Sequence, residues 1–186
     1  MMSIKVVISK YKEDVSWTKD LRHEFIIFNK NVEDNPHYQN NLPNFGREGH
    51  TFMNYIVENY DNLPDYNVFL QGNPFDHCPK VIDIVNNFDF KTDFLPLGNP
   101  YTYELNLTYN SIDEQMKKFA EEIGFDLRFP VTMVPGAQYI IHKSIIMRNP
   151  IDFYKKIRES LDHELYPQSV LDLEKTLFQL YGIYEV

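Results

Sequence analysis

Short apolar runs alternate with amphipathic stretches over the first half of the chain. The runs Ile4–Ser9, Phe25–Phe28 and Tyr66–Leu70 are rich in β-branched and aromatic residues and have the length of strands. Between the last two runs, apolar residues recur at helical spacing from His50 to Tyr60. Because strand, helix, strand is the order that builds a parallel sheet, the pattern predicts an α/β fold.

One domain over residues 1–186 is expected, built on an open, mostly parallel sheet with helices on both faces. Ile4–Ser9 and Tyr66–Leu70 should lie side by side at its centre. The remaining elements are predicted as follows: helices at Val81–Phe88, before Gly124, after Pro150 and at Ser169–Tyr181, a strand or strand pair at Gln138–Met147, and a long surface loop at Phe90–Tyr109.

Charge and composition exclude several classes of protein. Acidic residues exceed basic ones by 27 to 18, giving a net charge of -9, and no run of Lys or Arg offers a nucleic acid a basic patch. No apolar stretch reaches the roughly 18–20 residues that span a bilayer. Cys78 is the single cysteine, so no intramolecular disulfide forms, and the opening MMSIKVVISK lacks the apolar core of a signal peptide. Cytoplasmic residence is therefore expected.

The most distinctive polar residues stand at a helix start. Arg47 lies between Gly46 and Gly49 just before the predicted helix, where a guanidinium and free backbone N–H groups both favour a phosphate. The alternative is that Arg47 pairs with Glu48 or another neighbouring acid. Spacing alone leaves both interpretations open.

A second polar group follows the central strand. Gln71, Asn73, Asp76 and His77 come after Tyr66–Leu70, and a turn there can aim several of them into one crevice. Metal binding and loop-capping hydrogen bonds are both open, but adjacent Asp76 and His77 are poorly spaced as ligands and no Asp-x-Asp pair is present. The motifs of dinucleotide, ATP and serine-hydrolase sites are absent.

Several blocks taken together resemble a known but uncharacterised family. They are VVISKYKEDVSWTKDL, FNK, LPNFGREGHTFMNYIVENYDNLPDYNVFLQG, GAQYIIHKSIIMRNPIDFYKKI and LEKTLFQLYG. The family is defined only as a domain of unknown function, and is itself similar to small GT-A-type glycosyltransferases. In this chain Gln71-Gly72 stands at the strand end where metal-dependent GT-A enzymes carry Asp-x-Asp.

The resemblance implies a set of binding residues. It implies a nucleotide-binding first strand that ends near Ser9, Tyr11 and Glu13, and a donor-side loop at Arg47 and Glu48. It also implies that Gly136-Ala137-Gln138 faces the acceptor or the sugar.

The leading hypothesis is an enzyme that moves a sugar from a nucleotide-sugar donor to a carbohydrate or glycan acceptor. In this hypothesis Arg47 binds the diphosphate and Gln138 orients the sugar. Gln71-Gly72 and Asp76 or His77 lie near the reacting sugar, with Asp76 or His77 as the candidate catalytic group. A divalent cation such as Mn²⁺ is the cofactor to consider, although no metal-ligand set is assigned. The alternative is a noncatalytic nucleotide-sugar or carbohydrate-binding module that has lost the Asp-x-Asp metal site.

Overall fold

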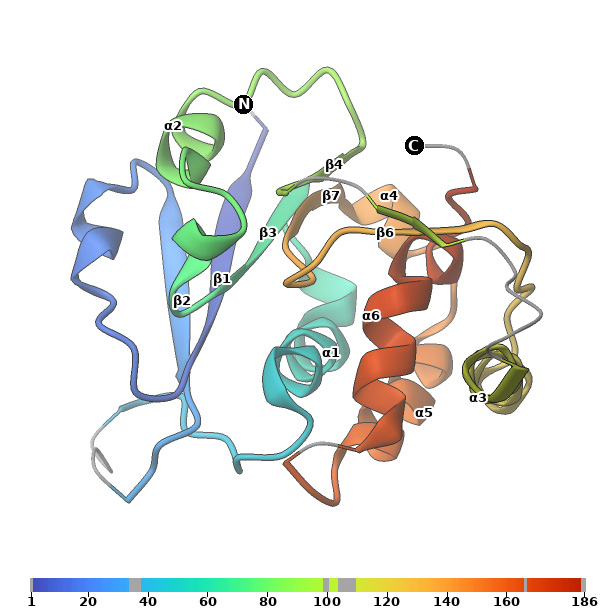
Figure 1. Ribbon diagram of the computed structural model, residues 1–186. Coiled ribbons are helices and arrows are strands. Elements are labelled where there is room, and N and C mark those ends of the chain that lie inside the picture. The colour runs from blue at the N-terminus through green and yellow to red at the C-terminus, as the bar shows by residue number, and fades with distance from the viewer. Residues whose placement is uncertain (1, 34–37, 99–100, 104–109, 166, 185–186) are drawn as a thin grey trace.

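The computed structural model describes residues 2–33, 38–98, 101–103, 110–165 and 167–184. It is an α/β domain whose main sheet has helices packed on both sides (Figure 1). Its strands are β1 (Ile4–Lys10), β2 (Glu24–Asn29), β3 (Tyr66–Gln71), β4 (Phe94–Pro96), β5 (Tyr101–Tyr103), β6 (Val131–Met133) and β7 (Tyr139–His142). Its α-helices are α1 (Arg47–Asn59), α2 (Val81–Asn86), α3 (Asn110–Ile123), α4 (Lys143–Ile146), α5 (Ile151–Leu161) and α6 (Gln168–Leu180).

The main sheet has the strand order β2-β1-β3-β7-β4. β1 pairs in parallel with both β2 and β3, so the expected neighbourhood of Ile4–Ser9 and Tyr66–Leu70 is confirmed. The carboxyl ends of these three strands consequently meet at one edge of the sheet. In α/β sheets that edge is where ligands bind.

The prediction of a mostly parallel sheet is wrong, because β7 runs antiparallel to both β3 and β4. Strand direction depends on how the chain returns to the sheet, and the apolar run YIIH carries no information about it. As a result β7 begins where β3 ends: Tyr139 pairs with Phe69. The segment just before β7 therefore reaches the same edge as the three parallel strand ends.

Alternate residues of the strands build two hydrophobic cores, one on each face of the sheet. Val7, Phe69 and Tyr139 point into the larger core, which α1, α5 and α6 cover. Val68 and Ile140 point to the opposite core, which contains Trp17 of a short 3-10 helix and Val81 and Val85 of α2. Helices on both faces are thus confirmed, and Figure 1 shows α1 and α2 on opposite sides of the central strands.

The expected loop at Phe90–Tyr109 is wrong for part of its length. Phe94–Pro96 forms the edge strand β4, and Tyr101–Tyr103 pairs with β6 in a second, two-stranded sheet; residues 99–100 and 104–109 lie outside the described part. The sequence pattern did not predict such strands, because proline weakens the pattern typical of a strand although it is tolerated in a strand at the edge of a sheet. Similarly, Gln138–Met147 is one short strand followed by the helical turn α4.

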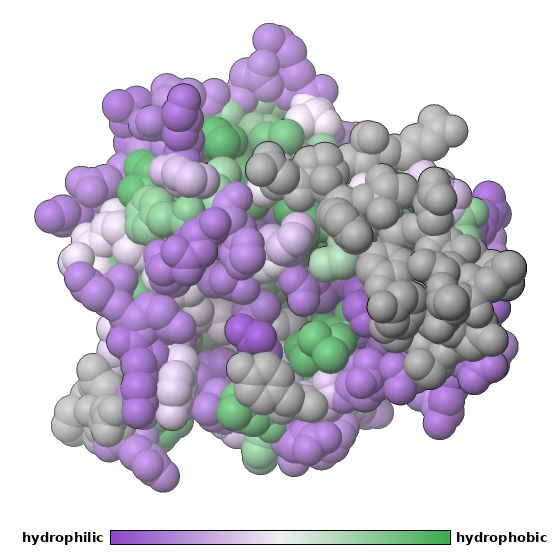
Figure 2. Space-filling view, in the orientation of Figure 1, coloured by the Kyte–Doolittle hydropathy of each residue, from purple (hydrophilic) through white to green (hydrophobic). Residues whose placement is uncertain are grey.

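Within the described residues no helix is long and apolar enough to cross a membrane. The face seen in Figure 2 is mostly hydrophilic, with hydrophobic residues in small separate groups. The apolar residues are instead concentrated in the two cores.

The turn into α1 has unusual backbone geometry. Gly46 and Arg47 have φ angles of 53° and 48°, both in the left-handed region. The Gly46 N–H donates to the Glu164 carbonyl at 2.8 Å, which ties the turn to the segment after α5. A Cβ on Gly46 would lie 2.7 Å from Leu161 Cβ, so the turn needs glycine for space as well as for conformation.

We predict that Gly46→Ala lowers the free energy of unfolding by about 2–5 kcal/mol, because left-handed strain and overpacking against Leu161 add together. Gly124→Ala is the matched control: Gly124 also has a positive φ, 94°, but a Cβ there meets nothing within 4 Å. That control should lose about 1–2 kcal/mol in urea unfolding. Equal losses in the two variants would contradict the steric part of the explanation.

Candidate functional site

A cleft of about 520 Å³ opens at the edge of the sheet where the three parallel strands end. It brings together residues from β1, the loop after β2, the start of α1 and the loop after β3. Its lining residues are Ser9, Lys10, Tyr11, Glu13, Lys30, Asn44, Arg47, Glu48, Gln71, Gly72, Asn73, Asp76, His77 and Leu165. Most of the side chains proposed from sequence are in this set; their roles stay predictions.

The start of α1 is bonded to the ends of β1 and β3. The Ser9 and Thr51 hydroxyls share a buried hydrogen bond of 2.9 Å, and Gln71 Nε2 donates to Glu48 Oε1 at 3.1 Å. Each bond joins a strand end to the first turns of the helix. These two hydrogen bonds therefore set how the start of α1 lies relative to the ends of β1 and β3.

Lys30 makes the corresponding bond from the end of β2. Its Nζ donates to the carbonyl oxygens of Phe45 and Arg47, the residues on either side of Gly46. Only 4% of Lys30 is exposed, and this burial lowers the pKa of its ammonium to about 7. A buried lysine at a cleft is a recognised mark of a functional site.

Arg47 and Glu48 form an ion pair at the mouth of the cleft, with Arg47 Nε 3.5 Å from Glu48 Oε2. The pairing expected as an alternative from sequence is therefore present. The Arg47 side chain is 43% exposed, whereas that of Glu48 is 14% exposed. Burial raises the pKa of the Glu48 carboxyl above its ordinary value, and the adjacent Arg47 opposes that shift.

His50 lies one turn further along α1 and is almost fully buried. Its Nε2 is 3.5 Å from Asp162 Oδ1, while Nδ1 has no hydrogen-bond partner within the described part of the chain. Burial, reinforced by the Lys30 ammonium, lowers the pKa of His50 to about 4, against the opposing effect of Asp162. His50 is consequently neutral at pH 7.

The wall formed by the loop after β1 is held by Glu13. The Glu13 carboxylate accepts a hydrogen bond from the Tyr11 N–H at 2.6 Å and lies against Gly72, where a Cβ would be 2.7 Å from Oε2. On the other side of Gly72, its carbonyl accepts a bond from Trp17 Nε1 at 2.9 Å. Tyr11 remains 40% exposed, so its ring can stack on a planar or sugar ligand.

The opposite wall carries the two candidate catalytic residues. Asp76 and His77 are both exposed to solvent, and Asp76 accepts a hydrogen bond from Asn73 Nδ2 at 3.0 Å. The His77 ring packs on Gly136, where a Cβ would lie 2.5 Å from a ring carbon. Gly136 has φ 88°, so only glycine allows both this conformation and this contact.

Gly136, Ala137 and Gln138 are not among the residues that line the cleft, but Gly136 and Gln138 contact the loop after β3. The amide of Gln138, which is 1% exposed, accepts from the Gln71 N–H at 3.1 Å and donates to the Pro74 carbonyl at 3.2 Å. It therefore holds the loop after β3. Ala137 lines a small neighbouring pocket together with Arg47 and Glu48.

The end of β3 carries no pair of carboxylates for a metal ion. Gln71 donates its side-chain amide N–H to Glu48, and Gly72 has no side chain. Among the residues that the structure describes, no group of three or more His, Cys, Asp or Glu side chains is placed to hold a metal ion. The cleft is lined both by cationic side chains, Lys10, Lys30 and Arg47, and by the carboxylates Glu13, Glu48 and Asp76.

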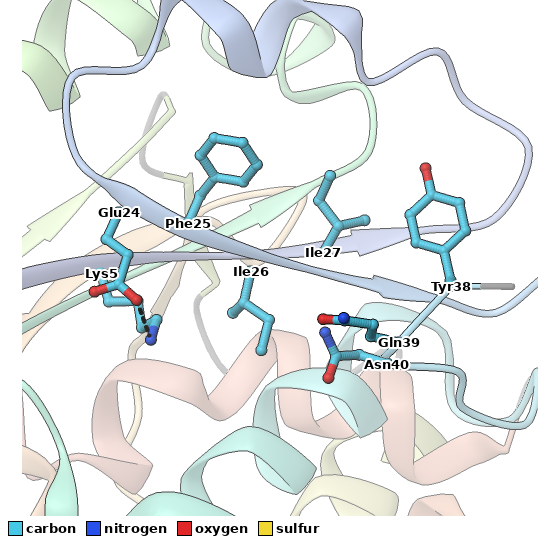
Figure 3. Close-up of a pocket in the computed structure, with 8 residues that line it drawn as sticks. All are labelled: Lys5, Glu24, Phe25, Ile26, Ile27, Tyr38, Gln39 and Asn40. Atoms are coloured by element: carbon cyan, nitrogen blue, oxygen red, sulfur yellow. Dashed lines mark ion pairs between the residues drawn. The ribbon is translucent and has the colours of Figure 1, made fainter.

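A second hollow, of about 580 Å³, runs along the outer edge of β2 (Figure 3). Figure 3 shows Phe25 and Ile27 on one side of the strand and Ile26 on the other. The charged groups there, Lys5 and Glu24, are paired with each other at 2.9 Å. Although this hollow is slightly larger, its polar groups do not converge, so the cleft is the better candidate site.

Sequence reasoning missed Lys30, His50 and Thr51. Lys30 directly follows the strand EFIIFN, as Gln71 ends YNVFLQ, so a polar residue at a parallel strand end was the available signal. His50 and Thr51 belong to the buried face of α1 and were indistinguishable from ordinary helix residues.

The comparison with known families matches the part of the chain that forms most of the cleft. Residues 6–88 match a family described as a protein of unknown function, DUF3431. The matched stretch runs from β1 to just beyond α2. No curated protein matches the chain. An uncharacterised family was expected and is confirmed over this stretch, whereas similarity to GT-A glycosyltransferases stays a hypothesis.

We predict that acid destabilises the protein through His50. The folded-state pKa of about 4 lies below the ordinary value of 6.5, so the unfolded state binds more protons in this window. Stability from this group is complete above pH 6.5 and falls as the pH drops toward 4, by about 3 kcal/mol in total.

The measurement is urea unfolding of wild type and His50→Gln between pH 4 and 7. The variant should show a flatter pH profile over that window. His163→Gln, which changes an exposed histidine, is the control and should keep the wild-type profile. If the free energy of unfolding of His50→Gln fell with decreasing pH as steeply as that of wild type, groups other than His50 would cause the acid sensitivity.

Proposed function

We propose that the cleft binds a nucleotide-sugar donor and that the protein transfers the sugar to a carbohydrate or glycan acceptor. The observation that supports this most is the convergence of cations, carboxylates, amides and an imidazole at the carboxyl ends of three parallel strands. Such an edge is the usual ligand site of α/β folds. Polar groups of all these kinds match the phosphates, hydroxyls and reacting centre of a nucleotide sugar.

Each group has a place in this reaction. Arg47, at the amino end of a 13-residue helix, is suited to the diphosphate. The exposed Tyr11 ring is suited to stacking on the base or the sugar. Gln71 and Glu48, bonded to each other at the strand end, are suited to the sugar hydroxyls.

The chemistry requires one base. The acceptor hydroxyl oxygen attacks the anomeric carbon, the bond from that carbon to the phosphate oxygen breaks, and the nucleoside diphosphate leaves with the electron pair. The hydroxyl proton goes to Asp76 or His77, which stand exposed on the cleft wall. Cationic groups at the diphosphate stabilise the charge that develops on the leaving group.

A binding module without catalysis is the second candidate. The observation that favours it is the Gln71–Glu48 hydrogen bond at the position of the Asp-x-Asp pair, where no metal-binding cluster is found among the described residues. Such a module would retain ligand affinity and lack turnover.

The deciding experiment is a thermal-shift screen of nucleotide sugars and free sugars, with and without Mn²⁺, followed by a transfer assay on each ligand that raises the melting temperature. Stabilisation by a nucleotide sugar and release of its nucleoside diphosphate to an acceptor support the enzyme. Stabilisation by a nucleotide sugar without turnover supports the binding module. If only ligands that lack phosphate stabilise the protein, the cleft does not bind a nucleotide-sugar donor, and the proposed transferase is contradicted.

We predict that Arg47→Ala weakens binding of a nucleoside diphosphate by about 10–100-fold, because a charge-assisted contact with an anion contributes about 1.5–3 kcal/mol. Stability should change little, since the Arg47 side chain is 43% exposed and the less exposed Glu48 keeps its hydrogen bond from Gln71. Calorimetric titration and a melting curve on one preparation measure both effects. Arg22→Ala, which removes an exposed arginine, is the charge control. Unchanged affinity with a much lower melting temperature would make Arg47 structural.

We predict that either Asp76→Asn or His77→Asn lowers the transfer rate at least about 100-fold, the usual contribution of a general base. Ligand affinity should stay within about threefold of wild type, because both residues are exposed and line the cleft, and the proposal gives them a role in proton transfer rather than in holding the donor. The assay is product release under saturating donor. Asp83→Asn, outside the cleft on α2, is the control. Full activity in both cleft variants would remove them from the mechanism.

A further inference from the structure

Lys30 is the most unusual residue of the cleft. An ammonium has three N–H donors. Two of them bond the carbonyl oxygens of Phe45 and Arg47. For the third, no partner exists among the residues that the structure describes, although Lys30 is 96% buried and lines the cleft. A buried donor without a partner is costly unless a ligand or a water molecule accepts its hydrogen bond.

The charges around Lys30 come from several elements. Glu48 and His50 face it from α1, and Asp162 faces it from the segment after α5. Both carboxylates favour the ammonium, but burial outweighs them and lowers the pKa of Lys30 to about 7. Near neutral pH the Lys30 amine is therefore only partly protonated. An anion bound in the cleft would stabilise the protonated ammonium and so raise the protonated fraction.

We propose that Lys30 and Arg47 form a metal-independent diphosphate site, in which the third N–H of Lys30 donates to a phosphate oxygen at the foot of the cleft. This proposal rests on the function proposed above and names how the anionic part of the donor is held. Two further observations support it. The strand end lacks paired carboxylates for a cation, and Lys30 already fixes the left-handed turn at the start of the 13-residue helix α1.

The site predicts proton uptake on binding. At pH 8 the Lys30 amine is mostly neutral, and a bound diphosphate stabilises the ammonium, so binding should take up close to one proton per site. At pH 6 the amine is already protonated and uptake from Lys30 should be near zero. Titration calorimetry of UDP and of pyrophosphate, in buffers of different ionisation enthalpy, measures this number directly.

Lys30→Met is the decisive variant. Its affinity for both probes at pH 6.5 should fall at least tenfold, and the difference in proton uptake between wild type and variant at pH 8 should be close to one proton. Taking that difference cancels protons released by the ligands themselves. Lys10→Met, which changes a less buried lysine of the same cleft, and His77→Asn should both keep the uptake.

Three outcomes would overturn the site: no binding of either probe to wild type, equal affinity in Lys30→Met, or equal uptake in that variant. Should Lys30→Met fail to fold, Lys30→Arg takes its place: its guanidinium stays charged at pH 8, so the difference in proton uptake from wild type should again be close to one proton, and equal uptake would overturn the site. Lys30-dependent binding of pyrophosphate without any nucleotide-sugar turnover supports the site and contradicts the proposed function. Turnover of a nucleotide sugar whose affinity does not depend on Lys30 supports the proposed function and contradicts the Lys30 site.

Discussion

Side chains at the ends of the three parallel strands hydrogen-bond the start of α1 and the turn before it, and most of these side chains line the cleft. Ser9 reaches Thr51 from β1, Lys30 reaches the carbonyls of Phe45 and Arg47 from beyond β2, and Gln71 reaches Glu48 from β3. Hydrophobic packing places α1 against the sheet, but the hydrophobic effect is non-directional. Directional hydrogen bonds fix its end.

These contacts place ionisable groups where water is scarce. Burial shifts the pKa values of Lys30, Glu48 and His50 toward their neutral forms, as expected for charged groups removed from water. Apolar residues of similar volume would in general stabilise a protein as well or better. Clusters that cost stability and lie in a cleft are characteristic of sites that bind or react.

The antiparallel strand β7 contributes as much to the site as the parallel strands do. Because β7 begins beside the end of β3, Gly136 and Gln138 are delivered to the cleft edge. Gln138 then bonds the backbone on both sides of the turn after β3, and Gly136 makes room for the His77 ring. In a fully parallel sheet the start of this strand would lie at the opposite edge. The mixed sheet is therefore part of how the candidate catalytic loop is positioned.

The sequence by itself determined the elements whose signals are local. Periodic apolar residues identified β1, β3 and α1, and the positions of Arg47, Gln71 and His77 at element ends placed them at one edge of a sheet. Only the tertiary structure decided the direction of β7 and the strand at Phe94–Pro96, because strand pairing is nonlocal. It alone decided that Lys30 is buried, since the depth of a side chain depends on what other segments pack over it.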